Sequence, residues 1–150
     1  MATFDPAHET PERTADGRHI VVDGRRWRAT NPNIPEELRA ELVRELMAAR
    51  RAVKAAKGDV SDTADARSRV QNAKVALGER GAPWWEPVTD DGLVHRIEAT
   101  LEALLFARGK VETIKPAEVA RIVGSPNWRD VMPQVGKVIR RHRPLDRPET

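Results

Sequence analysis

Apolar residues recur every three or four positions through most of this sequence, and that spacing is typical of one buried face of an α-helix. The longest such stretch lies between residues 33 and 58, where Asn33, Pro35 and Glu36 form a start signal. Its apolar stripe is formed by Leu38, Leu42, Leu46, Ala49, Val53 and Ala56. A second stretch between residues 61 and 80 carries Ala66, Val70, Ala73 and Leu77 at the same spacing. A short connection at Gly58 makes the two helices antiparallel neighbours, so these stretches predict a helical hairpin.

A short β-hairpin is predicted before these helices. Residues 19–22 and 25–28 flank Asp23-Gly24, a pair that accepts the positive φ angles of a two-residue type I′ turn. In that register Ile20 lies opposite Trp27, and both share a face with Val22. An isolated two-stranded ribbon is marginally stable, so we expect this face to pack against the helices. Residues 1–17 are almost without apolar side chains and predict a flexible tail, which leaves residues 18–87 as the first structured unit.

Residues 90–143 predict a module of three helices. The first begins at Asp90 or Asp91 and ends at Gly109, with an apolar stripe of Leu93 or Val94, Ile97, Leu101, Leu104 and Leu105. A short second helix opens around Pro116 and turns Val119, Ile122 and Val123 inward. A turn and a single helical turn at residues 128–132 lead to a third helix from Pro133 to about His142, with Val135, Val138 and Ile139 inward.

These elements together predict the fold class. It is mainly α, with a short N-terminal β-hairpin, an antiparallel helical hairpin and a trihelical module in which a short helix, a turn and a second helix form a helix-turn-helix arrangement. Residues 144–150 are expected to form a second flexible tail.

Positive charge is concentrated near the C-terminus. The formal net charge of the chain is only +3, but residues 121–147 hold seven basic and two acidic side chains. In a helix-turn-helix protein the second helix enters the major groove, and basic residues near its end contact phosphates. The candidate nucleic-acid-binding residues are those outside the apolar stripe of the last helix, namely Gln134, Lys137, Arg140, Arg141 and Arg143.

A second basic cluster is predicted at the tip of the helical hairpin. It comprises Arg50, Arg51, Lys54, Lys57, Arg67 and Arg69, with Asp59, Asp62 and Asp65 among them. Bases in the last turns of a helix complement the helix dipole, so we expect this cluster to be a solvated helix end.

Two adjacent tryptophans, Trp84 and Trp85, follow the second helix. Large aromatic side chains at such a point cap a core or seat one structural unit on another. We favour that role over stacking on a ligand.

The C-terminal third resembles a bacterial family of winged-helix-like domains of unknown function. The resemblance is carried by Thr113-Ile-Lys-Pro-Ala-Glu-Val-Ala120 and by Asn127-Trp-Arg-Asp-Val-Met-Pro133, followed by Val135. It implies a β wing after the last helix. Because Pro144 and Pro148 break any strand ladder there, we expect the module to lack an obvious wing.

The first part of the chain is similar to small uncharacterised bacterial proteins, some of which carry a Tol-type biopolymer transporter label. The residues concerned are Gly24-Arg-Arg-Trp-Arg28, Glu45-Leu-Met-Ala-Ala-Arg-Arg-Ala-Val53 and Ala73-Lys-Val-Ala-Leu-Gly-Glu-Arg-Gly81. No stretch approaches the roughly 18 apolar residues that a membrane helix needs, so the sequence does not support a role in transport.

No residues suggest catalysis or a cofactor. The chain has no cysteine, and its histidines His8, His19, His95 and His142 are not at metal-ligand spacing. No glycine-rich phosphate-binding loop occurs, and the acid–imidazole pair of Asp91 and His95 is more typical of a helix surface than of a general base. We therefore expect no enzyme activity, no metal, no cofactor, no membrane contact and a cytoplasmic location.

Two functional hypotheses remain open at this point. In the first, the protein binds nucleic acid, DNA or RNA, weakly through the last helix. In the second, it is an interaction adaptor or scaffold that binds a protein partner or itself and no nucleic acid. An enzyme without an identifiable site ranks third.

Overall fold

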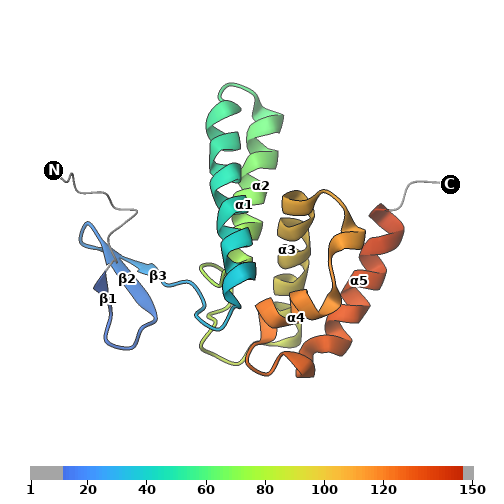
Figure 1. Cartoon of the computed structure of the whole chain (residues 1–150). Helices are drawn as coiled ribbons and strands as arrows, with labels where there is room; N and C mark the ends of the chain where they lie inside the picture. The colour runs from blue at the N-terminus through green and yellow to red at the C-terminus, as the bar shows by residue number, and fades with distance from the viewer. Residues whose placement is uncertain (1–11, 147–150) are drawn as a thin grey trace.

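The computed structural model describes residues 12–146 and has a small β-sheet followed by a helical body (Figure 1). Strands β2 (His19–Val22) and β3 (Arg25–Arg28) pair antiparallel, with Ile20 opposite Trp27. Asp23 and Gly24 have φ angles of 53° and 77°, as a type I′ turn requires. The predicted hairpin and its register are therefore confirmed.

A third strand lies within the segment that was predicted to be a tail. Strand β1 (Glu12–Arg13) pairs with β2, with Glu12 opposite Val21 and Arg13 opposite Ile20. A turn after β1 brings this strand to the open edge of β2. The turn is closed by the Thr14 N–H, which donates to the His19 carbonyl at 3.0 Å. The prediction of a tail is therefore wrong for these two residues, because backbone pairing at a strand edge needs no apolar side chains. Residues 1–11 lie outside the described part of the chain.

The expected packing of the hairpin face on the helices is also wrong. Val22 is 40% exposed and Trp27 is 42% exposed. Figure 1 shows the sheet standing to one side of the helical body rather than across it. The sheet instead gains a third strand, which pairs with β2 at two residues.

The tryptophan pair connects the sheet to the helical body. The Trp84 Nε1–H donates to the Ala29 carbonyl at 2.9 Å, just beyond β3. The Trp85 ring meets His19 of β2 edge to face, with centroids 5.5 Å apart, and Arg18 lies 5.2 Å from the centre of the same ring. These contacts match the seating role that the sequence favoured.

Helices α1 (Glu36–Ala55) and α2 (Val60–Ala76) form the predicted antiparallel hairpin (Figure 1). The first four positions of the α1 stripe and both small alanines of α2 are buried: Leu38, Leu42, Leu46, Ala49, Ala66 and Ala73. Helix α2 starts at an Asp59 cap that accepts from the Asp62 N–H. Helix α1 starts directly after Pro35, which makes no side-chain cap, so Asn33 does not cap it.

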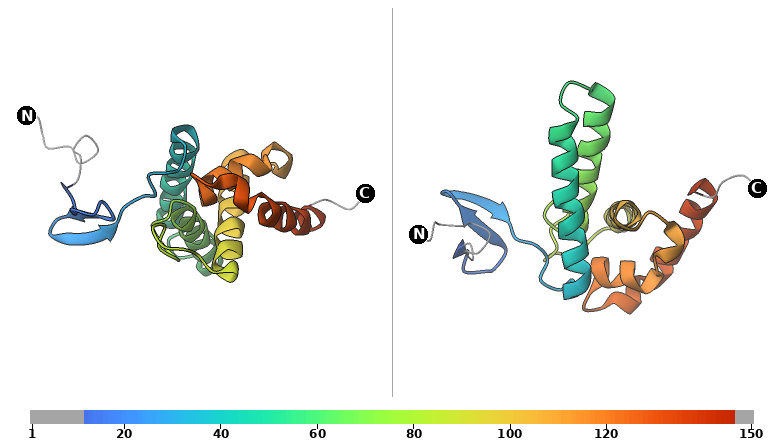
Figure 2. Two further views of the ribbon diagram at one scale, coloured as in Figure 1. Left: turned by 90° about the horizontal axis from the view of Figure 1, so that it is seen from below. Right: turned by 45° about the horizontal axis from the view of Figure 1, so that its top comes forward.

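Helix α3 (Asp90–Arg108) is the centre of the molecule. It begins at a Thr89 cap and ends at Gly109, whose φ of 83° stops the helix. Figure 2 shows α3 between the α1–α2 pair and the last helices. Its side chains Ile97, Leu101 and Leu104 are at most 2% exposed.

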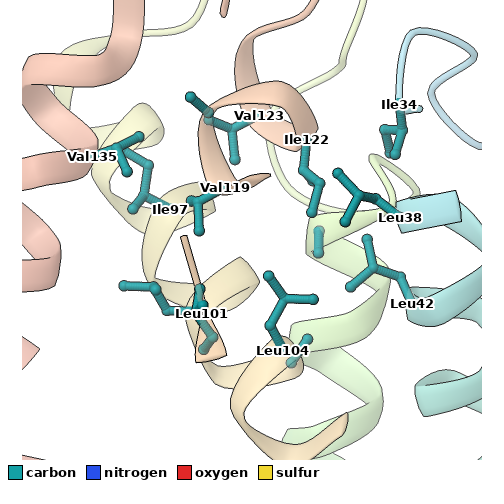
Figure 3. Packing of buried hydrophobic residues seen from close by; sticks show 14 of the residues in the cluster. Ile34, Leu38, Leu42, Ile97, Leu101, Leu104, Val119, Ile122, Val123 and Val135 are labelled. Carbon is teal, nitrogen blue, oxygen red and sulfur yellow. The ribbon is translucent and has the colours of Figure 1, made fainter. Parts of the chain in front are cut away.

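A single hydrophobic core joins all the helices. Figure 3 shows Leu38 and Leu42 of α1 in the same cluster as Leu104 of α3 and Ile122 of the C-terminal module. The N-terminal and C-terminal helices therefore share buried surface through α3.

The C-terminal helices follow the predicted order. After a 3₁₀ turn η1 (Val111–Thr113), helix α4 (Pro116–Gly124) leads to a second 3₁₀ turn η2 (Trp128–Val131) and then to α5 (Met132–Asp146). Helix α5 was predicted to end at about His142, but it continues through Pro144 to Asp146. The fixed φ of proline is compatible with a helix, and near a helix end it removes only one backbone hydrogen bond. Asp146 is the last residue that the structure describes.

Candidate nucleic-acid interface

Helix α5 separates apolar and basic residues onto opposite faces. Val135, Val138 and Ile139 are 0%, 1% and 5% exposed and pack into the core. Lys137 and Arg141 are exposed, and their spacing of four residues places them on the same outer face. The backbone of this helix thus places both side chains on the side away from the core.

The other three predicted site residues differ in their exposure and in whether the structure describes their side chains. Arg140 is also exposed, and its guanidinium lies back over Gly136, with Nη1 3.3 Å from where a Cβ of that residue would stand. Gln134 is half-buried one turn before Lys137. Arg143 belongs to α5, but its side chain lies outside the described residues. The structure therefore brings Lys137, Arg140 and Arg141 together, with Gln134 at the edge of the group.

Few acidic residues lie near the basic face of α5 in the sequence. Asp130 is the only acid between residues 128 and 142. Among the side chains that the structure describes, no carboxylate forms an ion pair with Lys137, Arg140 or Arg141. The nearby His142 does have a partner, because its Nε2 lies 3.0 Å from Oε2 of Glu102 on α3. The positive potential of the outer face of α5 is therefore available to a ligand.

Two further cations border the start of α5, and the sequence analysis did not name them as site residues. The guanidinium groups of Arg121 and Arg129 lie 4.9 and 4.4 Å from the centre of the Trp128 ring. Both arginines are exposed, and Trp128 is half-buried in η2, directly before α5. The sequence gives no signal for this cluster, because the turn after α4 is what brings Arg121 to a residue seven positions later.

Two other kinds of site were sought among the described residues. Between residues 12 and 146, no three His, Cys, Asp or Glu side chains are grouped so that they could hold a metal ion. Across that same range, no helix has the length and apolar character to cross a membrane.

The comparison with known proteins found a family match for the C-terminal helices. A family described as "Protein of unknown function (DUF3253)" matches residues 94–146, which run from the first turn of α3 to the end of α5. This segment is therefore similar to a domain of unknown function, as the sequence resemblance indicated. No curated protein and no solved structure matches the chain.

Proposed function

We propose that the protein binds double-stranded DNA weakly and with little sequence preference, through the outer face of α5 and the neighbouring η2 arginine cluster, which consists of Arg121, Trp128 and Arg129. The observation that carries this proposal is the three exposed bases Lys137, Arg140 and Arg141, which face away from the core without a described carboxylate partner. A helix with its apolar side anchored and its basic side outward is the form in which helix-turn-helix proteins present a helix to the major groove.

The residue types favour phosphate contacts over base reading. Lysine and arginine near the end of such a helix contact phosphates, which position the protein without carrying sequence information. Gln134 is the one side chain in the group suited to read a base edge, and it is half-buried. The proposed contacts are those of α5 and the η2 arginine cluster, and most of them are contacts of cations with phosphates. These features favour low sequence specificity.

A binding experiment with a matched control tests the proposal. The probe is a fluorescein-labelled 20-base-pair duplex of random sequence, titrated by anisotropy at about 50 mM salt, where phosphate contacts are strong. We expect Lys137→Glu with Arg141→Glu to weaken binding by at least about tenfold.

The control variant is Arg44→Glu with Arg51→Glu, which makes the same change in net charge at two exposed positions of α1. It should retain most of the affinity. The proposal fails if the duplex does not bind at low salt, or if both double variants lose affinity equally.

A further inference from the structure

A groove on the α1–α2 hairpin, away from α5, has the composition of a second binding site. Its volume is about 490 Å³. It is lined by Arg50 and Val53 of α1, by Arg67, Val70 and Gln71 of α2, and by Arg80 just beyond α2. We refer to it as the α1–α2 groove.

Two acids of the hairpin tip, Asp62 and Asp65, do not line this groove. Asp62 and Asp65 line a different surface hollow, which they share with Arg69 and Phe106 of α3. Arg69 is itself held there by Glu45, to which its Nε and Nη2 donate at 3.0 Å. The other basic side chains of the hairpin tip are exposed, as expected of a solvated helix end. The helical period places Asp62 and Asp65 on a different side of α2 from Arg67, whereas Asp59, at the start of α2, lines a hollow together with Arg67.

The positive charges of the groove have no described carboxylate partner. Arg80 donates from Nη1 to the amide oxygen of Gln71 at 2.7 Å, and no ion pair within residues 12–146 involves Arg50, Arg67 or Arg80. Lys74 lies one turn further along α2, where burial lowers the pKa of its ammonium group and the charge of Arg80 lowers it further. Glu79 acts in the opposite direction but does not outweigh these effects. An anionic ligand would relieve this like-charge repulsion.

The floor of the groove is apolar. Val53 and Val70 are half-buried between the two helices. Outside the groove lining, Nζ of Lys74 lies 5.8 Å from the centre of the Trp27 ring of β3. Trp27 is 42% exposed and belongs to the sheet face that no helix covers. The site therefore offers apolar surface beneath a rim of guanidinium groups.

We propose that the α1–α2 groove binds an acidic, amphipathic peptide segment of another protein. Carboxylates of that segment would pair with Arg50, Arg67 and Arg80, since arginine binds carboxylates with two parallel hydrogen bonds. Its apolar side chains would cover Val53 and Val70. This inference is independent of the DNA-binding proposal, because the residues involved belong to different helices.

Charge and geometry favour this occupant over two others. A second copy of the chain carries the same positive net charge of +3, so long-range electrostatic attraction does not favour it as the occupant. Single-stranded nucleic acid stacks its bases on exposed aromatic rings. One face of Trp27 is already covered by Arg25, whose guanidinium lies 4.2 Å from the centre of the ring.

The test measures binding of a labelled model peptide to the full chain. The probe is a fluorescein-labelled 16-residue peptide that alternates pairs of glutamate with pairs of leucine, followed by anisotropy. Two control peptides replace every glutamate with lysine or every leucine with serine. We expect the Glu/Leu peptide to bind and both controls to bind at least about tenfold more weakly, because charge and apolar contact are both required.

Protein variants locate the binding site. Arg50→Glu with Arg67→Glu should weaken peptide binding by at least about tenfold and leave duplex DNA binding within about twofold. The matched control Arg44→Glu with Arg51→Glu should change neither, because these exposed residues do not line the groove. All four substituted side chains are exposed, so the variants are expected to fold, which circular dichroism checks.

Other outcomes overturn the proposal. Equal loss of peptide binding in the groove variant and its control would mean nonspecific attraction to a basic protein. Binding of a 16-base single-stranded DNA that depends on Arg50 and Arg67, without binding of the peptide, would assign the groove to nucleic acid. A concentration-dependent dimer in sedimentation that the groove variant abolishes would assign it to a second copy.

Discussion

Arg108 is expected to hold three helices of the body together, and replacing it with methionine removes its charge while keeping most of its length. The Arg108 guanidinium, at the end of α3, donates from Nε and Nη2 to the Glu41 carboxylate of α1 at 2.7 and 2.8 Å. It also donates from Nη1 and Nη2 to Glu118 of α4 at 2.7 and 3.2 Å, and from Nη1 to the Thr113 carbonyl at 2.7 Å. Arg108→Met therefore leaves two neighbouring carboxylates without their cation.

The burial of these groups sets the magnitude. The side chains of Arg108, Glu41 and Glu118 are 17%, 19% and 28% exposed. An exposed ion pair contributes about 0–1 kcal/mol, whereas removing one partner of a fully buried pair costs about 3–5 kcal/mol. The network lies between these limits, so we expect Arg108→Met to lower the free energy of unfolding by about 2–3 kcal/mol.

The same network predicts a pH dependence. Burial acts to raise the pKa of Glu118, but hydrogen bonds from Arg108 and from the Lys115 N–H lower it more, so it lies below its ordinary value of 4.5. A carboxyl group whose pKa is lowered by folding stabilises the protein above its ordinary pKa and loses that contribution as the pH falls through the lowered value. The unfolding free energy should therefore fall below about pH 4.5, and this fall should be smaller in Arg108→Met.

Urea unfolding followed by tryptophan fluorescence measures both effects. At pH 7 the midpoint of Arg108→Met should fall by about 1 M urea. The control is Arg39→Met, which breaks the pair of Arg39 with Glu36, whose side chains are 38% and 76% exposed, and it should cost less than about 0.5 kcal/mol. The reasoning is refuted if the two variants cost the same, or if the cost of Arg108→Met is as large at pH 3 as at pH 7.

Two further predictions concern stability and use the same assay. Gly78→Ala should destabilise the folded protein by about 1–3 kcal/mol, and by more than Gly58→Ala does. Both glycines have positive φ, but only at position 78 would a Cβ lie 3.0 Å from Cβ of Asn31. Equal costs of the two substitutions would contradict this prediction. Arg69→Met should cost about 3–5 kcal/mol by leaving the Glu45 side chain, 3% exposed, without its cation. Adding Glu45→Leu to that variant should recover most of the loss, and no recovery would show that the carboxylate is not the cause.

The helices and the β-hairpin could be predicted because their signals are local. The Asp23-Gly24 turn fixes the hairpin register, and the helical spacing of Val135, Val138 and Ile139 fixes which face of α5 is buried. Once that face is known, the exposure of Lys137 and Arg141 follows from the geometry of a helix. The exposure of these two central residues of the candidate interface was therefore predictable from the sequence.

The remaining features depend on contacts between elements that are distant in sequence. Glu41 and Arg108 are 67 residues apart, and nothing local signals that they meet. The α1–α2 groove likewise required knowing which side of the hairpin α3 covers. The two-residue strand β1 was missed because its pairing uses only backbone groups at the edge of β2.

The salt dependence of DNA binding tests the central claim most directly. For a protein that contacts Z phosphates, the logarithm of the binding constant falls with the logarithm of the salt concentration with a slope of about −0.9Z. Lys137→Gln with Arg141→Gln removes two such contacts and should make the slope about 1.8 less negative, whereas Arg44→Gln with Arg51→Gln should leave it unchanged. A slope that is the same in the wild-type protein and in the Lys137/Arg141 variant would contradict a DNA-binding role for α5.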